Sequence, residues 1–134
     1  GTTLSRTIAG GYRVGTRVNL ERSMVLGGRL DGHLVQGHVD GLTRVVAIQP
    51  RGGFQTWRLS LPTELADEVA LKGSVALSGV SLTVSALRRD WFEVALIPET
   101  LAVTSLGHAR AGTRLHVEAD MVGKWIERLL AERE

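Results

Sequence analysis

The sequence predicts an all-β domain, either a sandwich or a small closed barrel, that ends in one α-helix. Several short segments alternate apolar and polar residues, which is the pattern of half-buried strands. Turn residues separate these segments about every ten positions, as in small antiparallel sandwiches and barrels. Residues 120–134 instead carry the four-residue apolar spacing of an amphipathic helix.

The strands that these patterns predict cover residues 54–61, 74–77, 80–86, 91–97 and 113–119. Between the first two, we expect Pro62 to begin a short helix that ends at Lys72-Gly73, because proline favours the start of a helix and glycine its end. Ser78-Gly79 indicates a bulge or a tight bend before the next strand. Pro98 indicates another helical turn, over residues 98–101.

The third of these strands, residues 80–86, has one apolar face and one polar face. Val80, Leu82 and Val84 must face the core, so Ser81 and Thr83 point outward side by side. Their hydroxyls can both donate and accept hydrogen bonds. Such residues are also ordinary on an exposed strand face, so the pattern alone leaves their role open.

The terminal helix has a broad apolar stripe. Its members are Met121, Val122, Trp125, Ile126, Leu129 and Leu130. Asp120 is well placed as the N-cap, since its side chain can accept from a free backbone N–H. The stripe must pack either on its own barrel or on the same helix of neighbouring subunits, and a tryptophan favours the interface.

Composition narrows the function classes. The chain has 134 residues, 43% of them hydrophobic, and a net charge of +2 with scattered basic residues, so nothing in it demands nucleic acid. It has no cysteine, which excludes disulfides and thiolate chemistry and fits a cytoplasmic protein. No charged-then-apolar leader opens the chain, and no apolar run reaches the length of a membrane span.

Residues 1–24 recur near the end of the chain, within residues 98–120, at a constant offset of 97 positions. The matched pairs are Leu4/Leu101, Thr7/Thr104, Gly10/Gly107, Gly15/Gly112, Thr16/Thr113, Arg17/Arg114, Val18/Leu115 and Glu21/Glu118. A repeat of domain length indicates tandem copies of one fold. We therefore expect residues 1–24 to be the tail of an incomplete first copy.

Residues 32–41 place His33 and His38 between glycines. Glycine permits close backbone approach, and histidine offers a donor and an acceptor near neutral pH, so a small-molecule site is one interpretation. The other is a glycine-rich entry to a strand whose histidines bond to backbone. No carboxylate cluster with metal-ligand spacing accompanies them, and no phosphate loop or nucleophile turn is present.

Two further stretches are candidates. Lys72 lies at a predicted helix end, where a positive charge is favoured by the helix dipole even without a ligand. Residues 96–101 join a strand end to a helix start, whose free N–H groups could receive a carbonyl oxygen or an anion, or simply turn a corner.

Six segments in order carry a resemblance to a known family. They are residues 18–22, 32–41, 72–76, 79–84, 92–101 and the final helix. Together they closely resemble riboflavin synthase of the alpha-chain type over essentially the whole chain. The resemblance implies two homologous six-stranded antiparallel Greek-key barrels followed by a C-terminal helix. On this reading, residues 1–24 are the tail of the first barrel, 25–119 the complete second barrel and 120–134 an oligomerisation helix.

The resemblance also implies an activity. Family members are trimers that convert two molecules of 6,7-dimethyl-8-ribityllumazine into riboflavin and a ribitylamino-pyrimidinedione, with no cofactor and no metal. Their active site forms between the first barrel of one subunit and the second barrel of its neighbour. Most of the catalytic work is then the positioning of two identical molecules.

Carried over by motif, the site has two groups of residues. His38 and Thr83 are the candidates for proton handling and orientation, and His33 more plausibly supports the loop. The substrate-binding candidates are Gly37, His38, Val39, Lys72, Ser81, Leu82, Thr83, Leu96, Ile97, Pro98, Glu99, Thr100 and Leu101.

Two departures from the family pattern keep alternatives open. The substrate-binding motifs of the first barrel are absent from this sequence, and Ser78 stands where the second barrel usually has an aspartate. A non-catalytic lumazine- or flavin-binding protein of the same fold is therefore one alternative. A small nucleic-acid-binding barrel is another, which the few scattered aromatic residues disfavour.

Overall fold

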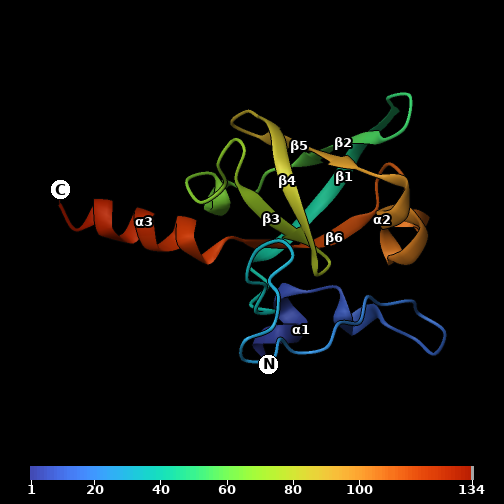
Figure 1. The fold of residues 1–134 in the computed structure, drawn as a ribbon, viewed down its shortest axis with the longest axis horizontal. Coiled ribbons are helices and arrows are strands. Elements are labelled where there is room, and N and C mark those ends of the chain that lie inside the picture. Colours follow the sequence, from blue (N-terminus) through green and yellow to red (C-terminus); the bar gives the residue numbers. More distant parts are fainter. Residues whose placement is uncertain (134) are drawn as a thin grey trace.

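The computed structural model describes residues 1–133 and shows a closed six-stranded barrel with a helix at the end of the chain (Figure 1). The strands are β1 Gly41–Pro50, β2 Gln55–Ser60, β3 Ser74–Leu77, β4 Val80–Leu87, β5 Trp91–Leu96 and β6 Arg114–Ala119. The α-helices are α1 Thr2–Arg6, α2 Pro98–Val103 and α3 Met121–Ala131, and the 3₁₀ turns are η1 Ala9–Gly11, η2 Thr63–Leu65 and η3 Ser105–His108.

The strands follow the spatial order β1-β2-β5-β4-β3-β6, and β6 pairs with β1 to close the barrel. Every pairing is antiparallel. Because β2 lies beside β5 and β3 beside β6, the connections are those of a Greek key. The predicted barrel is confirmed, and closure leaves the sheet without open edges.

The core inside the barrel is formed by alternate residues along the strands, whose side chains point inward. Trp57, Leu59 and Phe92 are almost completely buried. On β4, Leu82 and Val84 belong to this core while Thr83 is exposed, as the alternation predicts. The outward direction of the β4 hydroxyls is therefore fixed by the packing of the barrel interior.

The turn between β3 and β4 is a two-residue hairpin, as the sequence indicates. Leu77 pairs with Val80, and the intervening Ser78 and Gly79 have φ values of 47° and 84°. Two consecutive positive φ angles match the twist of antiparallel strands, as in type I′ turns.

The helix expected from Pro62 to Gly73 is wrong in length. Only η2 is helical there, with N–H groups bonded three residues back, Leu65 to Pro62 and Ala66 to Thr63. Val69 still donates to the Leu65 carbonyl at 3.2 Å, but Gly73 donates to Ala70 in a tight turn and Lys72 has a φ of 68°. A left-handed residue cannot continue a right-handed helix, so residues 70–73 form a turn instead.

The terminal helix α3 points away from the barrel (Figure 1). Asp120 caps it as expected, accepting the N–H of Val122 at 3.2 Å. Trp125 is 67% exposed, and the other large apolar residues of the stripe from Val122 onward are also exposed, so this stripe does not pack on the described barrel. The predicted helix extended to residue 134, which lies outside the described residues. No described helix is long and apolar enough to cross a membrane.

The two copies of the repeat share their local structure. Thr7 and Thr104 each donate to a carbonyl four residues back at 2.7 Å, Thr3 in one copy and Thr100 in the other. Gly15 and Gly112 have nearly the same φ, 92° and 91°. Positions 97 residues apart therefore share their backbone conformation as well as their residue type.

One repeated position has acquired different surroundings in the two copies, which gives a matched test. A Cβ on Gly107 would lie 2.0 Å from the Leu101 carbonyl oxygen, whereas a Cβ on Gly10 would approach nothing closer than a Leu4 side-chain atom at 4.0 Å. We expect Gly107→Ala to destabilise the protein by about 1–3 kcal/mol or more, as overpacking against backbone does. Gly10→Ala should leave stability nearly unchanged. Urea unfolding of both variants measures the difference, and equal midpoints would contradict the expectation.

Candidate functional site

The glycine- and histidine-rich segment, residues 32–40, is attached to β6 by a buried carboxylate. Glu118 is 7% exposed and accepts the backbone N–H groups of Gln36 and Gly37 at 2.9 and 3.1 Å. Two successive N–H groups can converge on one carboxylate because Gly37 has a φ of 77°. A buried carboxylate paired in this way fixes the backbone on the N-terminal side of His38.

A second carboxylate, that of Asp40, fixes the backbone on the C-terminal side of His38. Asp40 accepts the Ala119 N–H through Oδ2 at 2.8 Å, and its own N–H donates to the Val117 carbonyl at 2.9 Å. Its Oδ1 pairs with the Lys124 ammonium at the start of α3. His38 thus lies between two anchored residues, with its side chain exposed and without a hydrogen-bond partner among residues 1–133.

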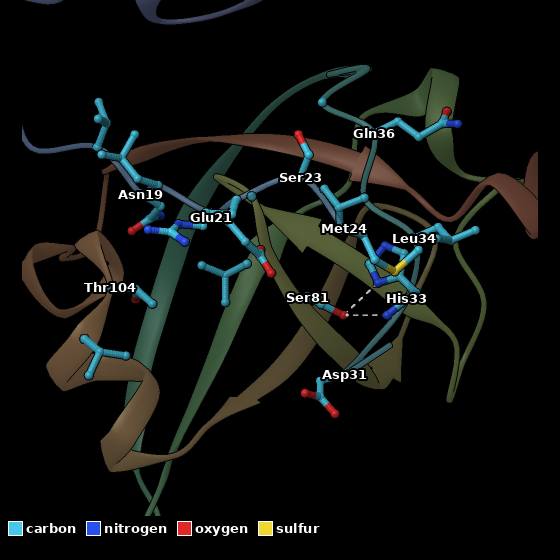
Figure 2. Close-up of a pocket in the computed structure, with 18 of the residues that line it drawn as sticks. Asn19, Glu21, Ser23, Met24, Asp31, His33, Leu34, Gln36, Ser81 and Thr104 are labelled. Atoms are coloured by element: carbon cyan, nitrogen blue, oxygen red, sulfur yellow. Dashed lines mark hydrogen bonds between the residues drawn. The ribbon is translucent and has the colours of Figure 1, made fainter. Parts of the chain in front are cut away.

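His33 lies against the outer face of β4. Its Nδ1 is 2.7 Å from Ser81 Oγ, and its backbone N–H also points to that oxygen, at 3.4 Å (Figure 2). This approach requires glycine at the preceding position, because a Cβ on Gly32 would lie 2.8 Å from Ser81 Oγ. His33 therefore bonds to a side chain rather than to backbone.

The direction of the His33–Ser81 bond depends on the tautomer of the imidazole. Ser81 Oγ accepts the backbone N–H and can either donate its proton to Nδ1 or accept a second proton from it. Nε2 is buried and has no partner among residues 1–133. The pair therefore offers a buried ring nitrogen next to a hydroxyl, which suits a polar group of a ligand.

A cavity of about 1190 Å³ lies beside this pair, between the segment at residues 17–37, the β3–β4 turn and the end of α2 (Figure 2). Of the predicted site residues it contains Gly37 and Ser81. Asn19, Glu21 and Thr104 also line it, although no motif marked them as site residues. Glu21 and Thr104 occupy repeated positions, which could have pointed to them, whereas Asn19 has His116 as its counterpart and carried no such signal.

The other predicted site residues lie outside that cavity. Lys72 and Thr83 are both exposed, and the Lys72 N–H bonds at 2.9 Å to the carbonyl of Val84, the residue after Thr83. Leu82 and Leu96 belong to the core and can reach a ligand only through backbone groups. The remaining residues are Val39, Thr100 and Leu101, which are half-buried, and Ile97, Pro98 and Glu99, which are exposed.

Residues 36–120 match the lumazine-binding domain family. The chain belongs to this family. The match begins at the Glu118-bound turn and ends at the N-cap of α3, so it includes the whole barrel with both carboxylate anchors.

Curated relatives extend the likeness beyond the lumazine-binding domain. The riboflavin synthase of Mycobacterium tuberculosis (strain ATCC 25618 / H37Rv) is 50% identical over 131 residues, which cover 96% of this chain and 65% of that protein. The riboflavin synthase of Brucella abortus (strain 2308) is 41% identical over 126 residues, covering 94% of this chain and 62% of the relative. The chain thus spans a little under two thirds of these relatives' length.

Solved structures share the fold of the lumazine-binding domain at low sequence identity. LumP complexed with flavin mononucleotide superposes with a TM-score of 0.61 at 19% identity, covering 64% of this chain and 49% of LumP. LumP complexed with riboflavin gives 0.61 at 20% identity, covering 69% and 50%. At these identities the likeness concerns the barrel itself.

The carboxylate of Glu118 can be tested by its removal. Glu118→Gln keeps the size of the side chain but leaves one of the two part-buried N–H groups of Gln36 and Gly37 without its acceptor. We expect a loss of about 1–3 kcal/mol of unfolding free energy, together with faster hydrogen exchange at those two amides. Glu64→Gln, at an exposed position in η2, is the control. Unchanged stability and exchange in Glu118→Gln would show that the carboxylate does not hold the segment.

Proposed function

We propose that this chain is the lumazine-binding second barrel of a riboflavin synthase, preceded at residues 1–24 by the tail of the first barrel. The observation that carries the proposal is the 50% identity to the riboflavin synthase of Mycobacterium tuberculosis over nearly the whole chain. The structural repeat, in which both copies have the same threonine hydrogen bonds, supports the tandem arrangement.

The proposed reaction joins two identical molecules of 6,7-dimethyl-8-ribityllumazine. One loses a proton from its C7 methyl group and the other accepts addition at C7. Transfer of a four-carbon unit then gives riboflavin and 5-amino-6-(D-ribitylamino)uracil. Since donor and acceptor are the same compound, no outside oxidant, cofactor or metal is part of the proposal, and the protein acts mainly by orienting the two molecules.

The proposed site lies on the outer face of β4 and the segments around it. A neutral heterocycle with a polyol chain needs hydroxyl and backbone partners more than charged clamps. Ser81, bonded to His33, and the Thr83 hydroxyl, which bonds to none of residues 1–133, suit that need, and the exposed Lys72 is bonded to the neighbouring Val84. The imidazole of His38, held between its two anchors, is proposed to handle protons together with Thr83.

Ser78 occupies the position at which the family usually has an aspartate. Here it lies in the tight β3–β4 turn, where its carbonyl accepts from Asn19 Nδ2 at 2.8 Å and its N–H donates to the His116 carbonyl at 2.9 Å. Its backbone is therefore structural, and the proposal assigns no proton transfer to it.

We further propose a cytoplasmic trimer assembled through α3. The apolar stripe from Val122 to Leu130 is exposed, and burying it against copies of itself would remove large aliphatic and aromatic surfaces from water. Trp125→Glu or Ile126→Glu should lower the oligomeric state, because a buried unpaired charge opposes the interface. Sedimentation velocity measures the effect, and unchanged mass for both variants, with the wild type a trimer, would refute this assembly.

The hydroxyls of β4 give a binding test. Thr83→Val keeps the shape and removes only the hydroxyl, so lumazine or riboflavin affinity should fall by about 0.5–1.5 kcal/mol, the worth of a neutral hydrogen bond. Ser81→Ala should weaken binding too. Ser85→Ala, on the same exposed face two residues further along β4, is the control and should bind normally. Affinity from fluorescence titration that is unchanged in the first two variants would place the ligand elsewhere.

The activity can be tested directly, because we expect this chain to supply only one of the two substrate sites. We expect purified residues 1–134 to bind lumazine but to form riboflavin very slowly, because the second molecule lacks its own barrel. That loss removes several of the roughly 7–11 kcal/mol available from proximity and orientation. Absorbance at the riboflavin band follows turnover, and addition of a separately produced first barrel should raise it. Full activity of the chain alone would contradict the half-site model, and normal binding with no activity in the mixture would favour a non-catalytic relative.

A further inference from the structure

The two copies of the repeat meet around a small cavity of about 260 Å³, which adjoins the larger cavity and shares Asn19, Ser105 and His108 with its lining. Every residue of the first copy that lines it has its counterpart, 97 positions later, in the same lining. Ile8 and Ser105, Arg17 and Arg114, and Asn19 and His116 are such pairs. The first copy, residues 1–24, is called the tail copy below, and the second copy is called the barrel copy. The two copies therefore face each other across a local pseudo-two-fold axis.

Two hydrogen bonds obey this symmetry. The Ile8 N–H donates to His116 Nε2 at 3.2 Å, and the Ser105 N–H donates to Asn19 Oδ1 at 2.7 Å. Exchanging the two copies converts one bond into the other, because Ile8 corresponds to Ser105 and His116 to Asn19. Each copy thus uses one side chain to accept a backbone N–H of the other.

The two acceptors differ in chemistry. An asparagine oxygen accepts at any pH, whereas an imidazole nitrogen accepts only when it carries no proton. Burial lowers the pKa of His116 below its ordinary value, which keeps the ring neutral near neutrality. The other titratable or charged groups lining the cavity are Tyr12, Arg17, His108 and Arg114. None of these is a carboxylic acid. Glu118, two residues further along the same face of β6, already accepts the N–H groups of Gln36 and Gly37.

We propose that Asn19 and His116 form a reciprocal clasp between the two copies, and that protonation of His116 opens the half of the clasp that holds Ile8. His116 is a positioning residue in this proposal, since it acts through the placement of the tail copy. Asn19 also donates to the Ser78 carbonyl, so the clasp fixes the wall that the tail copy gives to the larger cavity. The inference rests on the repeat and its contacts and holds whether or not the chain takes part in riboflavin synthesis.

The direction of the pH effect follows from linkage. A histidine whose pKa is lower in the folded state binds a proton more readily when unfolded, so the folded state is favoured above the unfolded pKa of about 6.5. That stability is lost as the pH falls below this value towards the folded pKa of His116. The clasp is therefore complete at neutral pH and half open in mild acid.

Amide hydrogen exchange followed by NMR tests the clasp on the full chain, corrected for intrinsic exchange rates. Between about pH 7.5 and pH 5.5, spanning the ordinary histidine pKa, we expect the wild-type Ile8 amide to lose about tenfold in protection, while Ser105 keeps its protection. Asn19→Ala should expose the Ser105 amide at both pH values. His116→Asn places in the barrel copy the residue that already serves in the tail copy, so Ile8 should stay protected at both.

His108→Asn is the matched control, because His108 lines the same cavity but its side chain accepts no backbone N–H there. It should keep the wild-type pH response. Core amides of β5 report whether each variant is folded, and should a variant fail to fold, the comparison of wild type with His108→Asn and the remaining variants still decides. An Ile8 amide that is equally protected at both pH values in the wild type, or one whose pH response survives in His116→Asn, would overturn the proposal.

Discussion

The pairing of Glu118 with two backbone N–H groups is the contact on which the candidate site depends. It joins residues 36 and 37 to the last strand of the barrel, and Asp40 repeats the connection at the other end with the Ala119 N–H. Carboxylates bonded to backbone N–H groups are among the stronger hydrogen bonds in proteins, and here one of them is buried. His38 acquires a fixed position only because the chain on both sides of it is held.

The same contacts link the site to the terminal helix. Lys124, in the first turn of α3, pairs with Asp40, and Gly123 lies so close to the Glu68 carbonyl that a Cβ there would approach it to 2.8 Å. Burial raises the pKa of the neighbouring Glu68, and the Lys124 ammonium acts in the opposite direction. The direction in which α3 leaves the barrel is therefore set by residues that also hold the histidine segment, so the path of α3 and the geometry of the site depend on the same contacts.

Repeated positions can look alike in sequence and act differently in the structure. Gly10 and Gly107 occupy matching positions, but only Gly107 is packed against backbone, that of Leu101, which is the counterpart of Leu4. Asn19 and His116 keep the same role in opposite directions while differing in their response to protons. Repeated sequence thus conserves local geometry, whereas the surroundings decide what each side chain does.

The sequence by itself determined whatever depends on neighbours along the chain. Alternation placed Ser81 and Thr83 outside the barrel and Leu82 inside, Ser78-Gly79 specified the turn, and Asp120 the cap of α3, since each effect acts over a few residues. Tertiary structure alone decided contacts between distant segments, such as Glu118 with Gln36 and His33 with Ser81. It also shortened the expected helix after Pro62 and left the apolar stripe of α3 exposed. These outcomes depend on how the closed barrel brings strand ends together. No local pattern of residues encodes which distant segments then lie in contact.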